Sequence, residues 1–288
     1  PVGADWKRLW SRHDAMFRLA DLYCAKGQFD RALDVVSQAI DEDTAVGERN
    51  WLLRLHQYKA GILWTQGDLS GADAEIQVAV EGADQENNVA GKIYFRCTYG
   101  MILLEMGNIG EAERAADEMK AEIDGWLRPT AEIRLWHYVA GHIDLARNDV
   151  GQAIEHFEQV VSQEPYQHEA NPENHAAWYD SLAYAYYLSG DLAGAQEWYE
   201  NIHALTTGRL GSGEIYAKSY FMLGKIYEQR GMDAEAIRSY RTFLDLWREL
   251  SARLADRPND EVAYELMNEA VADDALAAQA PGVEAGIG

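Results

Sequence analysis

The 288-residue sequence predicts an all-α protein, a right-handed solenoid of about six helical hairpins with a capping helix at its C-terminal end. Three observations predict this fold. One pattern of small and apolar residues recurs six times, its central turn residues are 40 to 42 positions apart, and the whole chain has only six prolines to interrupt helices. The turn residues are Gly27, Gly67, Gly107, Asn148, Gly190 and Gly231.

Each copy of the pattern describes two amphipathic helices joined by a tight turn. Apolar residues recur at spacings of three and four on both sides of the turn, which is the period of one helix face. The central Gly or Asn suits a helix C-terminus, because it adopts the left-handed conformation at low cost. A small residue lies seven positions before each turn residue and an Ala lies five positions after it, so the two helices can approach closely. These residues are Ala20, Ala60, Gly100, Gly141, Ala183 and Gly224 before the turns, and Ala32, Ala72, Ala112, Ala153, Ala195 and Ala236 after them.

Prolines mark the expected helix starts. Pro129-Thr130 opens the fourth unit, and Asn171-Pro172-Glu173 opens the fifth with an N-cap followed by Pro in the first turn. Pro258-Asn259-Asp260 starts a further helix that should cover the open end of the stack. We therefore expect a repeat array over 1–257, a capping helix over 258–279 and a flexible tail over 280–288.

The first copy reads Leu19-Ala20-x2-Tyr23-x3-Gly27-x4-Ala32, and copies of this kind resemble the tetratricopeptide repeat. The resemblance covers roughly residues 5–250, although the period of about 40 exceeds the family's usual period of about 34 and implies longer helices or linkers. The C-terminal third, with TTGRL at 206–210 and FLDLWRE at 243–249, resembles repeat regions of large bacterial proteins that also contain a kinase module or a β-propeller. The resemblance implies a non-catalytic scaffold for protein–protein interaction.

An excess of acidic residues excludes several classes of partner. The chain has 48 Asp and Glu against 25 Lys and Arg, a formal net charge of −23. Binding to nucleic acid or to an anionic membrane needs clustered Lys and Arg, so neither is expected. No apolar run reaches the roughly 18 residues of a membrane-spanning helix. We expect a cytoplasmic protein.

The sequence offers no specific sign of a metal, a cofactor or an enzyme. Cys24 and Cys97 are two isolated thiols, and a disulfide framework or a zinc site would need more cysteines at closer spacing. His137 and His142 are five residues apart, so they point to different helix faces and are not a metal-binding pair. No nucleophile motif such as GxSxG occurs. We expect no cofactor, no metal and no catalytic residue.

The resemblance implies that the first helix of each unit lines a concave groove. Between Arg147 and Arg209 the chain has no Lys or Arg, but it has ten acids and nine aromatic residues. An acidic, aromatic groove suits a basic or aromatic peptide, through charge pairing and cation–π contacts. The alternative is that most of these aromatics pack between helices. The candidate peptide-binding residues are Tyr58, Trp64, Tyr138, His142, Asp180, Tyr184, Tyr187 and Phe221.

Two other functions stay open at this point. The chain could serve as the regulatory sensor arm of a larger signalling protein and respond to a small ligand or to self-association. A remote alternative is a glycosidase built as a toroid of paired helices, in which Asp180, near Tyr184 and Tyr187, would be the acid or base. The chain is short for a closed toroid, and the regular Gly spacing fits an open solenoid better.

Overall fold

The computed structural model describes residues 5–24, 26–47, 49, 51–125, 132–162, 173–205 and 213–253. Over these residues the chain forms twelve α-helices and no strand. The helices are α1 (Asp5–Cys24), α2 (Phe29–Val46), α3 (Leu52–Gln66), α4 (Leu69–Gln85), α5 (Val89–Glu105), α6 (Ile109–Gly125), α7 (Ile133–Ala146), α8 (Val150–Ser162), α9 (Glu173–Ser189), α10 (Leu192–Ala204), α11 (Gly213–Gln229) and α12 (Asp233–Arg253).

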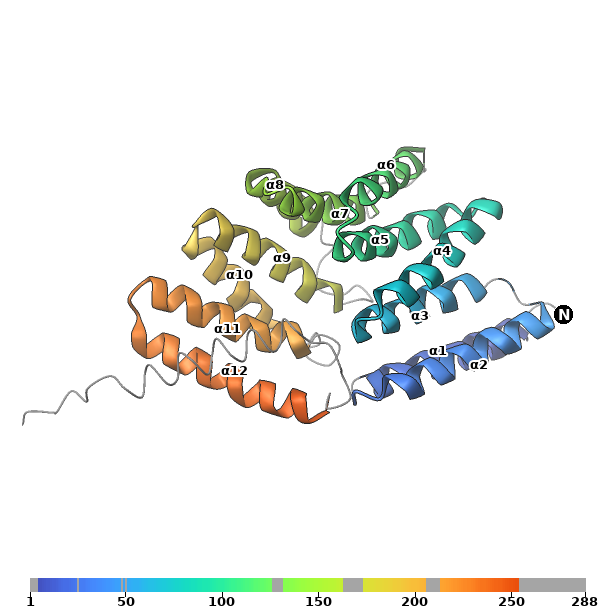
Figure 1. Ribbon diagram of the computed structural model, residues 1–288, viewed down its shortest axis with the longest axis horizontal. Helices are drawn as coiled ribbons and strands as arrows, with labels where there is room; N and C mark the ends of the chain where they lie inside the picture. Colours follow the sequence, from blue (N-terminus) through green and yellow to red (C-terminus); the bar gives the residue numbers. More distant parts are fainter. Residues whose placement is uncertain are drawn as a thin grey trace, which may run out of the picture.

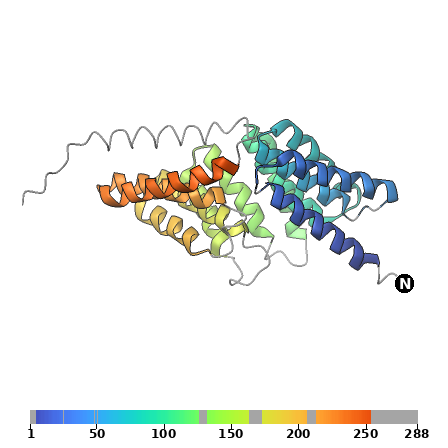
Figure 2. The same cartoon turned by 90° about the horizontal axis from the view of Figure 1, so that it is seen from below.

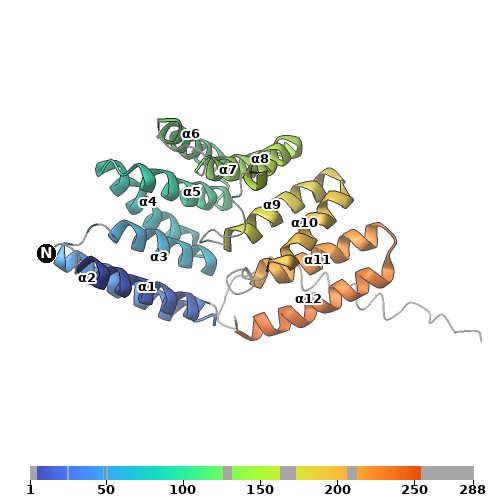
Figure 3. The ribbon, with the colours of Figure 1, turned by 180° about the vertical axis from the view of Figure 1, so that it is seen from behind.

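The twelve helices form six antiparallel hairpins that stack in chain order (Figure 1). The array curves, with α1 and α2 at one end, α11 and α12 at the other, and α7 near the apex when seen from behind (Figure 3). From below, the first three hairpins and the last two lie on opposite sides (Figure 2). The predicted all-α solenoid of six hairpins is confirmed.

All six predicted turn residues adopt a left-handed backbone. Their φ angles are 69° at Gly27, 86° at Gly67, 76° at Gly107, 62° at Asn148, 84° at Gly190 and 70° at Gly231. Asn is among the few residues besides Gly that reach this region readily, which explains the substitution in the fourth hairpin. At Gly67 the amide donates to the carbonyl of Trp64, which ends α3 and turns the chain into α4.

The small residues of the repeat lie where neighbouring helices pack closely. The six alanines after the turns have 5% of their surface exposed or less. A Cβ atom built on Gly141 would lie 2.6 Å from Cε1 of Phe157, so only Gly lets α7 pack this closely on α8. Gly224 has the same role against the ring of Tyr240 in the last hairpin.

Several predicted features fall outside the described residues. These are Pro129-Thr130, Asn171-Pro172, the capping helix over 258–279 and the tail over 280–288. Within the described part, the side chains of Asp68, Asn88, Asp149 and Asp191 cap helix N-termini, and each accepts a hydrogen bond from the backbone amide three residues later.

Candidate partner-binding surface

The first helices of the hairpins form the inner side of the array. Helices α3, α5, α7 and α9 each contact the next first helix along the chain, whereas α2, α4, α6, α8 and α10 pack on their own hairpin and on the first helix of the next one. A curved stack brings its inner helices together and spreads its outer helices apart. The inner surface is therefore the concave one.

An open hollow of about 640 Å³ lies on this concave surface and crosses four first helices. Its volume is within the range of about 300–1,000 Å³ that ligand pockets occupy. We call it the central hollow. Its described lining residues are Leu53, Arg54 and Gln57 of α3, Asn88 at the N-cap of α5, Ala90, Gly91, Tyr94, Phe95, Cys97 and Thr98 of α5, Leu135 and Tyr138 of α7, and Trp178 of α9.

The wall of the central hollow combines buried apolar side chains with one exposed aromatic ring. Phe95 and Trp178 are 3% and 4% exposed, so they form a fixed floor. Tyr94 is 45% exposed and presents its ring to solvent. Burial of the phenol raises the pKa of Tyr94 and the charge of Glu132 adds to the rise, while the charges of Arg134 and Arg54 oppose it. The phenol of Tyr94 is therefore neutral at pH 7.

Hydrogen bonds within the chain fix two polar side chains of this surface, Gln57 and Asn88. Gln57 Nε2 donates to Thr98 Oγ1 at 3.0 Å, which ties α3 to α5. Asn88 Oδ1 accepts from the Gly91 amide at 3.0 Å, so its carbonyl is used by the helix cap. Cys97 is partly exposed at the hollow, and desolvation of its thiol raises the pKa to about 12, so the sulfur is protonated at neutral pH.

Of the predicted site residues, Tyr138 lines the central hollow. Its ring stands edge-on to His142 at a centroid distance of 4.7 Å, and burial raises the pKa of its phenol. His142 Nε2 lies 3.0 Å from Ser181 Oγ, which links α7 to α9. Burial lowers the pKa of His142 to about 4, and the positive charge of Lys218 acts in the same direction, so the ring is neutral at pH 7. His142 thus positions Tyr138 and is not part of the described lining.

Asp180 is already paired within the chain. Lys218 Nζ of α11 donates to Asp180 Oδ2 at 2.8 Å. Burial alone would lower the pKa of Lys218, but the charge and hydrogen bond of the Asp180 carboxylate raise it. The other carboxylate oxygen of Asp180 is buried without a hydrogen-bond partner among the described residues. Asp180 therefore already has a cationic partner within the chain.

The predicted aromatic pair Tyr184 and Tyr187 belongs to this same internal network. Lys218 Nζ lies 5.6 Å from the centroid of the Tyr184 ring, a cation–π contact from within the chain. Tyr187 Oη accepts a hydrogen bond from Gln229 Nε2 at 2.8 Å. Tyr184 is still 37% exposed, so it keeps surface that a partner can contact.

The structure corrects the placement of Phe221. Its side chain is completely buried in a core cluster with Tyr199 and Phe243, so it has no surface to offer a partner in this conformation. The expected inward position holds for the backbone of α11, but the apolar side chain turns into the gap between α11 and α12.

Tyr58 and Trp64 do not join the central hollow. Tyr58 packs edge-on against Phe17 of α1 at 4.7 Å and donates its hydroxyl hydrogen to Asp21 and to the Phe17 carbonyl. Trp64 is half-buried against the core cluster between α3, α4 and α5. Both residues contribute to packing of the first hairpins, and the expected second cluster of anchors is split between two places.

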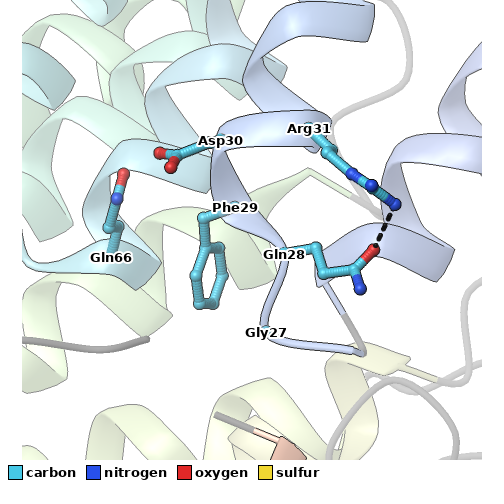
Figure 4. A pocket seen from close by; sticks show the side chains of 6 residues that line it. All are labelled: Gly27, Gln28, Phe29, Asp30, Arg31 and Gln66. Atoms are coloured by element: carbon cyan, nitrogen blue, oxygen red, sulfur yellow. Dashed lines mark hydrogen bonds between the residues drawn. The ribbon is translucent and has the colours of Figure 1, made fainter. Parts of the chain in front are cut away.

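A smaller hollow of about 380 Å³ lies at the turn of the first hairpin (Figure 4). Its walls are the turn itself and Gln66 at the end of α3, with the Phe29 side chain between them. The guanidinium of Arg31 points away from Phe29 and donates to Gln28 Oε1 at 3.3 Å. This hollow is small and polar, and it does not include the first-helix residues that line the concave surface.

Sequence reasoning missed four residues of the site: Arg54, Tyr94, Arg134 and Trp178. A usable signal existed, because Arg54 and Tyr94 each lie six positions before the small residue of their hairpin, as do Leu135 and Lys218. Extending the inward-facing positions by one helical turn would have included them. Arg134 and Trp178 lie seven and five positions before the small residues of their hairpins. The lining residues Leu53 and Phe95 occupy the same two repeat positions in their own hairpins, so these positions were also available.

Among the described residues, no group of three or more His, Cys, Asp or Glu side chains is arranged to hold a metal ion. None of the described helices combines the length and the apolar character that a membrane-spanning helix requires.

Comparison with known proteins identifies the repeat. Residues 14–43 and 174–249 each match a family model described as tetratricopeptide repeat. No curated protein sequence matches the chain.

Among solved structures, the APC/C hetero-tetramer Cut9-Hcn1 is similar with a TM-score of 0.58 and 17% identity, over 89% of this chain and 42% of that one. BtubC from P. vanneervenii has a TM-score of 0.53 and 15% identity, over 69% and 81% of the two chains. PilW, a type IV pilus biogenesis factor, has a TM-score of 0.51 and 14% identity, over 88% and 97%.

At these identities the solved structures show the fold alone, and the chain spans about two fifths of the Cut9-Hcn1 chain that it matches. The family-model matches show tetratricopeptide repeats over residues 14–43 and 174–249, and the solved structure shows a similar fold over most of the chain.

Proposed function

We propose that this chain is a non-catalytic interaction module that holds an extended segment of a protein partner across its concave surface. Tetratricopeptide-repeat proteins are generally scaffolds for protein–protein interaction, and stacked helical repeats create extended concave surfaces that suit this task. The anchor site is the central hollow, where a side chain of the segment would insert next to Tyr94 and Tyr138.

The central hollow is the single observation that carries the proposal. It is the place where four consecutive hairpins contribute side chains to one concavity, and a partner in it would be contacted by α3, α5, α7 and α9 together. Its volume accommodates an aromatic side chain with neighbouring backbone, and buried aromatic anchors supply most of the affinity at such interfaces. The internal pairing of Asp180 with Lys218 supports this location over the Tyr184 and Tyr187 surface.

A peptide array tests the proposal. The purified chain is screened against peptides in which one aromatic residue is flanked by Glu, by Gln or by Lys. We expect binding to part of this array, and we expect Ala90→Trp to abolish it because the new ring fills the central hollow. Ala74→Trp is the matched control, since Ala74 is exposed on the second helix α4 and lines neither described hollow.

The basic partner expected from the sequence stays a prediction, and the Lys-flanked peptides test it. If no peptide binds, or if Ala90→Trp and Ala74→Trp behave alike, the central hollow is not the partner site. In that case a chain that forms dimers in sedimentation analysis would favour the alternative of a sensor arm controlled by self-association.

A further inference from the structure

The lining of the central hollow has the opposite charge to the rest of the chain. The whole sequence carries a net charge of −23, with 48 acidic residues. The thirteen described lining residues nevertheless include no Asp or Glu, and the charged residue among them is Arg54. Such a local reversal of charge is an interaction signal, because the overall composition predicts acids on any randomly chosen surface of this molecule.

Two arginines beside the hollow have no acidic partner within ion-pair distance among the described residues: Arg54 and Arg134. Each guanidinium instead lies over a tryptophan ring, Arg54 at 5.5 Å from the ring of Trp51 and Arg134 at 4.9 Å from the ring of Trp178. Trp178 is itself a floor residue of the hollow. By contrast, Arg96 is buried between Asp84 and Glu118, and Lys92 pairs with Glu122. The arginines beside the hollow are therefore held in place by aromatic contacts while their charges stay uncompensated.

The hollow also lies beside the Asn88 amide group and the N-terminal ends of three helices. The cap of α5 uses Asn88 Oδ1, which leaves the Asn88 amide N–H groups as the free polar part of that side chain. Leu53, Ala90 and Leu135 lie in the first turns of α3, α5 and α7, so the N-terminal ends of three helices meet at the hollow. These ends carry partial positive charge, which adds to that of the arginines. Among the described acids, Glu132 acts on Tyr94 through its charge, and its Oε2 atom is buried.

We propose that the central hollow recognises an acidic segment of a protein partner, in which a Glu or Asp side chain pairs with Arg54 and Arg134 while a neighbouring aromatic or aliphatic residue inserts beside Tyr94. The proposal rests on the function proposed above and names the chemistry of the partner. A planar guanidinium can bind a carboxylate through two parallel hydrogen bonds, and stacking on tryptophan restricts its orientation beforehand.

The test compares affinities of the Glu-, Gln- and Lys-flanked peptides, measured by fluorescence polarisation with the full chain. We expect the Glu-flanked peptide to bind at least tenfold more tightly than the Gln-flanked one, with an advantage that shrinks as salt is raised. Arg54→Glu should remove this advantage, and Arg54→Gln should reduce it. Arg241→Glu is the control, because Arg241 is exposed on α12 and the substitution changes the net charge by the same amount.

The outcomes separate the two proposals. Equal affinity for Glu- and Gln-flanked peptides, or an unchanged preference in Arg54→Glu, would overturn the acidic-partner proposal, while loss of all binding in Ala90→Trp would still support the hollow as the site. A preference for Lys-flanked peptides would also overturn it. Circular dichroism of each variant must match that of the original chain, and Arg54→Gln provides the second test if Arg54→Glu fails to fold.

Discussion

Lys218 and Asp180 form an ion pair between the fifth and sixth hairpins, with Nζ and Oδ2 2.8 Å apart. Asp180 lies in the middle of the stretch between Arg147 and Arg209, which has no Lys or Arg, and Lys218 comes after this stretch. The ammonium group of Lys218 also lies over the ring of Tyr184. The chain thus supplies its own cation where a basic partner would otherwise be expected. The pairing therefore favours the central hollow, lined by residues of α3, α5, α7 and α9, over Asp180 as the proposed partner site.

Removing the cation should destabilise the C-terminal hairpins. In Lys218→Met the carboxylate of Asp180, whose Oδ1 is already buried without a described partner, would lose its charge partner. We expect a loss of about 1 to 3 kcal/mol in the free energy of unfolding, since the pair is only partly buried. Urea denaturation measures it. The double variant Lys218→Met with Asp180→Leu should lose less free energy of unfolding than the two single variants lose in total. Additive losses would show that the two residues are not energetically coupled.

The stability of the protein should fall on acidification because of two histidines. Burial lowers the pKa of His137 and of His142 to about 4 from 6.5. Between pH 6.5 and 4 the unfolded chain therefore binds more protons than the folded one, so the free energy of unfolding decreases as the pH is lowered through this window. The loss is on the order of 1 to 3 kcal/mol for each histidine.

Denaturation midpoints at pH 7, 6, 5 and 4 check this dependence. In His142→Gln the slope between pH 6.5 and 4 should become shallower, because one titrating group has been removed. A slope that is the same in both proteins would show that His142 titrates normally in the folded chain.

Two glycine substitutions should have opposite effects on stability. Gly141→Ala forces a Cβ atom against the buried ring of Phe157, so we expect a loss of about 1 to 3 kcal/mol and a melting temperature several degrees lower. Gly61→Ala, on α3, meets no atom within 4 Å and should gain up to about 1 kcal/mol from helix propensity. Calorimetry of both variants checks the pair. Equal melting temperatures would mean that α7 can move away from α8 at no cost.

The two aromatic surfaces of the first helices can be separated by mutation. Tyr94→Ala removes the exposed ring at the central hollow, and we expect it to weaken peptide binding at least tenfold. Tyr184→Ala combined with Tyr187→Ala should weaken it less, because those rings contact Lys218 and Gln229 within the chain. Titration of both variants with the same peptide decides between them. The reverse order of effects would return the site to the surface expected from the sequence.

The hairpin architecture could be predicted because each hairpin is specified by a few local requirements. A residue that accepts positive φ must follow the first helix, and a small residue of one helix must face the side chains of its neighbour, as Gly141 faces the ring of Phe157. These requirements recur at a fixed spacing, so the sequence displays them directly.

The site was less predictable because it depends on contacts between hairpins. The sequence places Asp180 and Tyr184 on an inner helix, but it does not reveal that Lys218, 38 positions after Asp180, reaches back to them. Phe221 has an inner position in the repeat, yet its side chain turns toward Phe243. Curvature of the array and side-chain rotation decide these points, and neither follows from spacing alone.

Hydrogen–deuterium exchange of the full chain, with and without a peptide selected from the array, tests the central claim most directly. We expect new protection in the N-terminal parts of α3, α5 and α7, over 52–57, 88–98 and 133–138, and unchanged exchange in the second helices α4, α6 and α8. Protection confined to those second helices, or to α9 and α11 around Tyr184, would contradict it.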